Sequence, residues 1–287
     1  MSAAPQTLNS VSSTADKLEK LYKLKEFIKT FDSVIIAFSG GVDSSTLAGV
    51  TYHVLKDRAL AITALSPTTP SREIEEAKRI AQEIGIRHEF IEINELESDG
   101  FVENSPERCY FCKRHLLSAM VSYAKQKGYS AVFEGTNASE LKGHRPGYKA
   151  IKEFEIVHSP WAEFGFTKDE IREVARSMGY SFHNKPSLAC LASRIPFGIR
   201  IDEGRLRMVD EAENAIIEIA RVRQVRVRNF NGMAVIEVDR DERHKFFSQE
   251  VMDEIAERLK RIGFKYVLLD MEGYRTGKLS GFGGAGR

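Results

Sequence analysis

The sequence predicts an α/β fold, with a doubly wound, mostly parallel sheet followed by a smaller α+β unit. Through about the first two thirds of the 287-residue chain, short apolar segments alternate with amphipathic segments of helical period. This alternation is typical of βαβ units, whose parallel strands are covered by helices on both faces. Beyond about residue 200 the pattern changes to a helix, a hairpin, a second helix and a last strand. We therefore expect a disordered tail at 1–15 and two units at 16–199 and 200–287.

Each strand of the predicted parallel sheet leads into a helix. Apolar residues at helical spacing first predict a helix over Leu18–Ile28. The next elements are strand Val34–Phe38, a helix from about Ser44, strand Ala59–Leu65, helix Ser71–Ile84, strand His88–Ile93, helix Cys109–Lys127, strand Ala131–Phe133 and helix Thr167–Met178. Ligands of such sheets bind beyond the carboxyl ends of the strands. Ser39, Ser66 and Gly135 therefore mark the expected binding edge.

The second unit follows an irregular segment over residues 183–201, which we expect to be functional or to link the units. Its predicted elements are helix Glu203–Ala220, strand Gln224–Phe230, strand Met233–Val238, helix Glu242–Ile262 and strand Tyr266–Asp270. Asn231-Gly232 stands between two alternating strands and predicts a tight hairpin turn.

Charge and composition narrow the function classes. The net charge is only +1, whereas nucleic-acid binders commonly carry a basic excess, so a nucleic-acid partner is not expected. No apolar run is long enough to cross a bilayer, and the polar N-terminus lacks a signal-peptide pattern. Three cysteines form an odd and low count, unlike a secreted disulfide framework. We therefore expect a cytoplasmic protein without a membrane partner.

The most informative segment is Phe38–Ser45, with the sequence FSGGVDSS. Gly40 and Gly41 lack a Cβ, so the backbone can turn tightly and bring its N–H groups close to an anion. The positive end of the following helix favours the same negative charge. Hydroxyl donors come from three serines of this segment, Ser39, Ser44 and Ser45. No Gly-Lys-Ser/Thr follows, so this is not a Walker A loop. The segment predicts a binding site for the phosphates of ATP.

Residues at two other strand ends are expected to complete the nucleotide site. Ala64 and Ser66 would flank the base and ribose, because backbone groups at strand ends can hydrogen-bond an adenine edge. Gly135 would line the other side, and Asn137 could hydrogen-bond a hydroxyl or a phosphate. Asp43 would bind Mg²⁺, which prefers one or two carboxylates together with phosphate oxygens. Helix capping by Asp43 is the alternative.

The cysteines predict a second chemical feature. Cys109 and Cys112 lie three residues apart near a helix start, so both thiols share one face and the helix N-terminus would favour their thiolates. Cys190 lies in the irregular segment. Three thiolates are one short of the usual ligand set of a [4Fe-4S] cluster, which leaves one iron open for a sulfide. A structural zinc with His115 or His183, a redox-active pair and unrelated buried thiols are the alternatives.

Arginines predict an anion-binding surface. Arg226 and Arg228 are two apart on a strand, so they project to one face and suit bidentate binding of a phosphate or carboxylate. Arg194, close behind the third cysteine, is a similar candidate for substrate binding. A solvated strand face is the alternative for the strand pair. Glu237 on the next strand would bind a metal or pair with these arginines.

Five segments together resemble the LarE family, ATP-dependent sulfur transferases that make the nickel-pincer nucleotide cofactor and belong to the PP-loop ATP pyrophosphatases. They extend the match from about residue 20 to about residue 275. The segments are SGGVDSS within Ser39–Ser45, EGTNAS within Glu134–Ser139, HRPG within His144–Gly147, KPSLACLASRIPFG within Lys185–Gly198 and VRVR within Val225–Arg228. The resemblance implies a Rossmann-like PP-loop fold and a homo-oligomer.

The resemblance also implies a reaction. ATP would adenylate a carboxylate of a pyridinium biscarboxylic acid mononucleotide and release pyrophosphate, and sulfur would then replace AMP to leave a thiocarboxylate. Some family members give up the sulfur of a single cysteine at the position of Cys190. Cys109 and Cys112 depart from that pattern and resemble members with a [4Fe-4S] cluster and external sulfur. Both sulfur sources stay open here.

Three other functions are compatible with the same loop. A tRNA thiolase uses this adenylation chemistry, although it would need a basic surface. An amide synthetase of the NAD or GMP synthetase type would use ammonia in place of sulfur. A non-enzymatic nucleotide-binding module is the third. Pyrophosphate release that depends on a carboxylate nucleotide, and not on tRNA or ammonia, separates them.

Overall fold

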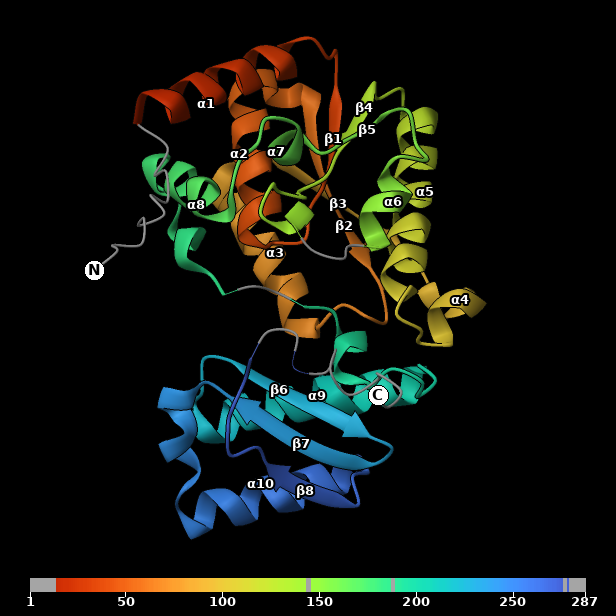
Figure 1. The fold of residues 1–287 in the computed structure, drawn as a ribbon, viewed down its shortest axis with the longest axis vertical. Coiled ribbons are helices and arrows are strands. Elements are labelled where there is room, and N and C mark those ends of the chain that lie inside the picture. The colour runs from red at the N-terminus through yellow and green to blue at the C-terminus, as the bar shows by residue number, and fades with distance from the viewer. Residues whose placement is uncertain (1–13, 143–145, 187–188, 276–277, 279–287) are drawn as a thin grey trace, which may run out of the picture.

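The computed structural model describes residues 14–142, 146–186, 189–275 and 278. It contains a five-stranded sheet in the order β3-β2-β1-β4-β5 and a three-stranded sheet in the order β6-β7-β8 (Figure 1). Every pairing in the first sheet is parallel. The predicted α/β class with a smaller second sheet is thus confirmed. Most of the predicted tail lies outside the described residues.

The first sheet brings the predicted binding edge together. Its strands are β1 Val34–Ala37, β2 Ala59–Leu65, β3 Arg87–Glu92, β4 Ala131–Phe133 and β5 Val157–His158. Val34 of β1 pairs with Ala59 of β2 on one side and with Ala131 of β4 on the other. The chain therefore changes winding direction between β1 and β4, which is where open α/β sheets bind ligands.

Helices cover both faces of this sheet, as Figure 1 shows. One face packs against α1 Thr14–Lys29, α2 Val42–Leu55, α3 Ser71–Ile84 and α8 Lys168–Ser177. The other packs against α5 Arg108–Lys127 and α6 Pro146–Ile151, with α4 Asp99–Val102 before α5 and α7 Pro160–Glu163 after β5. Burial on both faces explains why the central strands are almost wholly apolar. No helix in the described residues is both long enough and hydrophobic enough to cross a membrane.

The second sheet carries its own helices. Its elements are α9 Glu203–Ala220, β6 Val225–Phe230, β7 Met233–Val238, α10 Gln249–Ile262 and β8 Tyr266–Leu269. Asn231 and Gly232 have φ of 53° and 94°, and two positive φ angles are what a two-residue type I′ hairpin requires. The predicted hairpin is confirmed.

The prediction of one helix over Glu242–Ile262 was wrong at its start. Arg240–Phe246 forms a 3₁₀ helix, and α10 begins at Gln249. Ser248 causes the break, because its side chain caps α10 by accepting a hydrogen bond from the Val251 N–H at 3.2 Å. The short elements β5 and α6 were not predicted, since neither is long enough to show a period.

The hydrophobic core around the second sheet also contains residues that precede it in sequence. Leu191 and Ile195 from the irregular segment, and Phe101 from α4, pack with Val209 of α9 and Ile236 of β7. The irregular segment that carries the third cysteine is therefore held between the two sheets. The division at residue 199 remains a prediction.

His88 of β3 contacts β2 just before the carboxyl end of that strand. Its Nε2 is 2.8 Å from the Thr63 hydroxyl, which donates a hydrogen bond to the Phe38 carbonyl at 2.7 Å. Burial lowers the pKa of His88 to about 4, and the positive charge of Lys78 acts in the same direction. The fold therefore favours the neutral imidazole.

We expect this histidine to make the protein sensitive to acid. An unfolded histidine has a pKa of about 6.5. Between that pH and about 4 the unfolded chain binds more protons than the folded protein, so the free energy of unfolding falls as the pH drops. Replacing His88 by Gln should flatten this part of the profile. Urea unfolding between pH 4 and 7 measures it, with His53→Gln at an exposed position of α2 as the control. An equally steep acid limb in His88→Gln would contradict the assignment.

Candidate functional site

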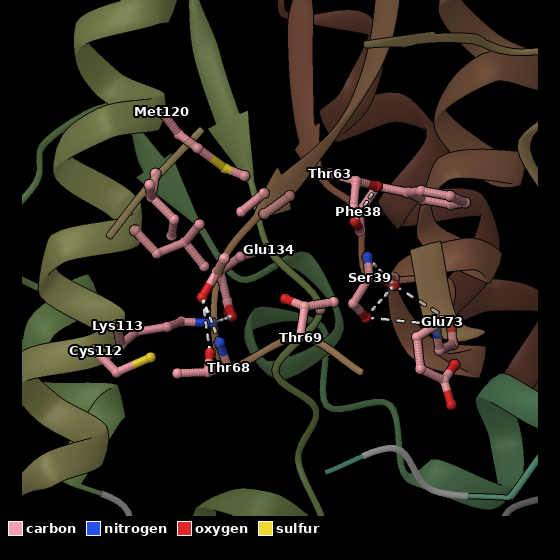
Figure 2. A pocket seen from close by; sticks show the side chains of 18 of the residues that line it. Phe38, Ser39, Thr63, Thr68, Thr69, Glu73, Cys112, Lys113, Met120 and Glu134 are labelled. Carbon is pink, nitrogen blue, oxygen red and sulfur yellow. Dashed lines mark hydrogen bonds and ion pairs between the residues drawn. The ribbon is translucent and has the colours of Figure 1, made fainter. Parts of the chain in front are cut away.

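A cavity of about 330 Å³ lies at the carboxyl ends of β1, β2 and β4. Its size is within the range of small-molecule sites. Predicted residues in its wall are Ser39, Gly41, Asp43, Ser44, Ala64, Ser66, Cys112 and Gly135. Figure 2 shows Ser39 on one side of the cavity and Lys113 and Cys112 on the other. The structure thus brings the predicted loop, both strand ends and one thiol to a single cavity.

The loop after β1 presents backbone donors at this cavity. Gly41 is the N-cap of α2 and no side chain caps the helix there, so the N–H groups of its first turn are available to an anion. Gly40 has φ +69°, and a Cβ on it would lie 3.1 Å from the Ala77 Cα. Both its conformation and the nearby helix α3 therefore require glycine.

Serine hydroxyls extend this set of donors. The Ser39 and Ser44 Oγ atoms are 3.0 Å apart, and the Ser39 N–H donates to Ser44 Oγ at 3.2 Å. Both side chains are in the cavity wall. The Ser45 hydroxyl is buried behind the loop and has no hydrogen-bond partner among the described residues. Ser39 and Ser44, rather than Ser45, are thus placed beside a ligand.

Asp43 is held on two sides. Its carboxylate forms an ion pair with Lys168 at the start of α8, and its other oxygen, Oδ1, is buried with no hydrogen-bond partner in the described structure. The Trp161 indole N–H donates to the Asp43 carbonyl at 2.9 Å. Trp161 is fully buried, as expected of a packing residue. Oδ1 is thus the carboxylate oxygen that a metal ion could use without displacing Lys168.

Lysines near the loop come from distant segments. Lys185, at the start of the segment that leads to the third cysteine, donates to the Gly40 carbonyl at 3.0 Å and pairs with Glu73 at 3.2 Å. Together with Lys168 it places positive charge around a loop that has no lysine of its own. Sequence reasoning missed both, because neither belongs to the loop motif and only the fold brings them there.

The end of β4 forms the part of the wall next to the loop and the start of α2. A Cβ on Gly135 would lie 3.0 Å from the Ser44 backbone nitrogen, so this glycine permits the close approach of β4 and α2. Asn137 is buried behind it, where its Oδ1 accepts from the Glu140 N–H at 3.2 Å. Its Nδ2 is buried with no hydrogen-bond partner in the described structure. Asn137 therefore shapes the turn after β4 and is outside the cavity wall.

An ion pair that was not predicted, between a partly exposed lysine and a buried carboxylate, lines the cavity. Lys113 Nζ lies 2.6 Å from Glu134 Oε2, and Figure 2 shows this pair between Cys112 and the loop. Burial alone would raise the pKa of Glu134, but Lys113 together with the hydroxyls of Ser159 and Thr136 brings it below its usual value. Glu134 is thus a carboxylate that fixes a cation at the cavity wall.

The three cysteines lie near one another, and Cys112 lines the cavity. Cys109 and Cys190 are exposed, whereas Cys112 is partly buried in the wall. Burial raises the pKa of Cys112 well above its usual value, and the charges of Cys190, Glu95 and Cys109 raise it further. The expectation that the helix start favours a thiolate is wrong for Cys112, because burial and neighbouring negative groups dominate. The fold nevertheless brings Cys190 beside the helical pair.

The arrangement of the three cysteines decides which kind of metal group they could bind. No group of three or more His, Cys, Asp and Glu side chains in the described ranges could hold a single metal ion. A [4Fe-4S] cluster spaces its cysteines more widely than one ion does, because irons and sulfides lie between them. The predicted [4Fe-4S] cluster therefore stays a prediction. One form of the zinc alternative needs His183 as a ligand. In the structure His183 lies next to α8, where its Nδ1 is 2.9 Å from the Tyr180 carbonyl oxygen.

Arg194 is fully buried and ties the cysteine segment to α9. Its guanidinium pairs with Glu213 at 2.7 and 2.9 Å. It also donates to the carbonyls of Ala189 and Cys190 at 2.6 and 2.9 Å. Arg194 thus orients the backbone at Cys190, and a substrate would reach it only by displacing these contacts.

Arg226 and Arg228 are 4% and 5% exposed, so the solvated-face interpretation is wrong. Arg228 pairs with Glu237 at 2.6 Å and donates to the Ser193 carbonyl at 2.8 Å. The predicted pairing of Glu237 with these arginines is thus observed. Burial lowers the pKa of Arg226 to about 10, and the charge of Arg194 adds to this effect.

Arg226 also belongs to a cluster of arginines around one buried carboxylate. Glu213 is fully buried and lies among Arg72, Arg194 and Arg226, which together offset the effect of burial and lower its pKa. Arg72 reaches Glu213 from α3, at 2.8 Å. Arg72 also lies 3.9 Å from Glu73, so a second carboxylate borders this cluster.

Comparisons with known proteins agree with this geometry. The sequence profile of the NAD synthase family matches residues 16–141, which contain the loop and the cavity wall up to Glu140. The chain is 39% identical over 261 residues to the uncharacterized protein slr1717 of Synechocystis sp., covering 91% of this chain and 97% of that protein.

Two further relatives cover similar lengths. The uncharacterized protein MJ0830 of Methanocaldococcus jannaschii is 30% identical over 262 residues, 90% of this chain and 98% of that protein. The pyridinium-3,5-bisthiocarboxylic acid mononucleotide synthase of Lactiplantibacillus plantarum is 29% identical over 254 residues, 88% of this chain and 91% of that protein.

The contact between Gly135 and α2 makes a testable prediction. In Gly135→Ala the new methyl group would push the first turn of α2 away from β4, and overpacking of this kind costs about 1–3 kcal/mol. We expect ATP to bind roughly tenfold more weakly. Calorimetry measures the affinity. Gly204→Ala in α9, whose new Cβ meets only an Asp202 side-chain oxygen at 3.3 Å, is the control. Unchanged affinity in folded Gly135→Ala would refute this role.

Proposed function

We propose that the chain is a LarE-like PP-loop ATP pyrophosphatase that acts as an ATP-dependent sulfurtransferase. Its substrate would be a pyridinium biscarboxylic acid mononucleotide, in which one carboxylate becomes a thiocarboxylate. One observation carries the proposal. The same cavity is bordered by the start of α2, which is left open because its N-cap has no side chain, and by Cys112, one of the three cysteines. That arrangement lets activation by ATP and delivery of sulfur occur on one bound molecule.

The first step activates the carboxylate. Backbone N–H groups of α2 and the hydroxyls of Ser39 and Ser44 would hold the phosphates of ATP. An oxygen of the substrate carboxylate attacks the α-phosphorus, the bond to the β-phosphate oxygen breaks, and pyrophosphate leaves. Mg²⁺ held by Asp43 would neutralise part of the triphosphate charge. The chain itself contributes positioning and fixed donors rather than a covalent bond.

The second step transfers sulfur. A carboxylate cannot expel oxide, but AMP leaves the acyl-adenylate readily once a nucleophile adds to the carbonyl carbon. If Cys190 is the donor, its sulfur forms a thioester and AMP departs with the electron pair. Loss of the Cα proton then breaks the cysteine Cβ–S bond, which leaves dehydroalanine and the thiocarboxylate. If the sulfur is external, a sulfide replaces AMP directly.

Cys109, Cys112 and Cys190 are the residues that would hold a [4Fe-4S] cluster. When bound, the cluster would supply an open iron that can carry a sulfide. Cys112 is placed in the wall of the nucleotide cavity and Cys190 is held by Arg194, so the thiols approach the cavity from two segments. The guanidinium groups around Glu213 would be the donors for the substrate phosphate or its second carboxylate.

The adenylation step is tested by Asp43→Asn. We expect pyrophosphate release in the presence of the pyridinium biscarboxylate nucleotide to fall by at least about 10²-fold, because the metal-bound triphosphate loses its anchor. The control is Asp57→Asn at an exposed position after α2. Release supported by tRNA or by ammonia, but not by the nucleotide, would instead identify a tRNA thiolase or an amide synthetase. Full activity of Asp43→Asn would refute the assigned role.

The sulfur source has its own test. Protein purified without oxygen should be brown with about four iron per chain. Single replacements Cys109→Ala, Cys112→Ala and Cys190→Ala should each remove the visible absorbance and thiocarboxylate formation. Each should retain pyrophosphate release, since adenylation precedes the sulfur step. Colourless protein with stoichiometric zinc, or Cys190 converted to dehydroalanine after one turnover, would contradict the cluster.

A further inference from the structure

We propose that Asn104 and Arg108 are positioning residues that set the distance between Cys190 and the pair Cys109–Cys112. This inference rests on the proposed function, in which the three thiols act together. The contacts that support it join two segments far apart in the sequence, one leading into α5 and the other following Cys190.

Asn104 holds the segment after Cys190 by its backbone. Its side chain is fully buried, and Nδ2 donates to the carbonyls of Pro196 and Ile199, both at 2.8 Å. Ile195 contributes a third carbonyl at 3.3 Å, and the Gly198 N–H donates to the Asn104 carbonyl at 3.2 Å. Asn104 adopts φ 54°, a conformation that few residues other than glycine and asparagine accept. The local backbone is thus shaped to aim this amide.

Arg108 completes the clamp. Its Nη1 donates to the Asn104 Oδ1 at 2.5 Å and to the Ala192 carbonyl at 3.0 Å. The guanidinium also lies 4.6 Å from the centre of the Phe197 ring. Arg108 is 9% exposed, and no carboxylate among the described residues forms an ion pair with it. Burying a charge whose partners are neutral oxygens and an aromatic ring is costly, so packing alone does not account for this residue.

The position of these contacts relates them to the thiols. Arg108 immediately precedes Cys109 and lies one helical turn before Cys112, while Ala192 is two residues after Cys190. The other side of the same segment is held by the Leu191 N–H, which donates to the Thr68 carbonyl at 2.8 Å. The Cys190 backbone is therefore fixed between the cavity and the start of α5. A shift of this clamp would move Cys190 relative to the helical pair without altering the pair itself.

The test uses metal-free, reduced protein and dibromobimane, which becomes fluorescent when it joins two neighbouring thiols. Mass spectrometry then separates the link within α5, Cys109–Cys112, from links between Cys190 and either helical cysteine. In Asn104→Gly, which retains the positive φ, we expect the Cys190 links to fall at least about fivefold relative to the link within α5. Arg108→Lys should act in the same direction. Arg114→Lys, at an exposed residue of the same helix, is the matched control.

A second replacement of Asn104 separates the effect of the lost hydrogen bonds from a folding defect. Asn104→Asp retains an acceptor for Arg108 but removes the donors to the segment, and it should also lower the Cys190 links selectively. Unchanged cross-link ratios in folded Asn104→Asp and Arg108→Lys would overturn the proposal, as would a loss of both kinds of link together. Affinity for ATP should be unaffected by these variants. Because the readout requires neither ATP nor iron, its failure is distinct from failure of the proposed sulfur transfer.

Discussion

The unpaired N–H groups at the start of α2 are the feature on which the rest of the site depends. Helix termini need hydrogen-bond partners, and here the loop supplies only the Ser39 hydroxyl, which accepts from the Gly41 N–H at 3.4 Å, while the N-cap has no side chain to bond the first turn. The fold keeps these donors facing a cavity, with Gly40 turning the chain sharply and Gly135 allowing β4 to approach. The same donors can therefore serve a phosphate without rearranging the backbone, which is the condition for electrostatic stabilisation.

Positive charge around this cavity is held by carboxylates on separate elements. Lys113 pairs with Glu134, Lys168 with Asp43, and Lys185 with Glu73. These pairs hold long side chains in place while no anion is bound, and a highly charged nucleotide would compete for them. The arrangement compensates for a loop that lacks its own lysine. It also links the loop to the segment that leads to Cys190, because Lys185 donates to the Gly40 carbonyl.

The segment around Cys190 connects the two sheets through an ion pair and hydrogen bonds as well as through apolar packing. Leu191 and Ile195 pack into the second core, Arg194 pairs with Glu213 of α9, and Arg228 of β6 donates to the Ser193 carbonyl. The arginines first predicted as substrate ligands are thus also structural. Two of them, Arg194 and Arg228, donate to backbone carbonyls next to the thiol and so position it.

The sequence by itself determined the local structure and the loop. Apolar segments with clear periods placed β2, α3 and α9 at their observed ends, and the glycines and serines after β1 specified a phosphate loop because their chemistry is local. Only the tertiary structure decided which distant groups meet. The pairing of Asp43 with Lys168, the burial of Arg226, the raised pKa of Cys112 and the approach of Cys190 all depend on contacts between remote segments. Burial and charge act through space, and no spacing along one chain records them.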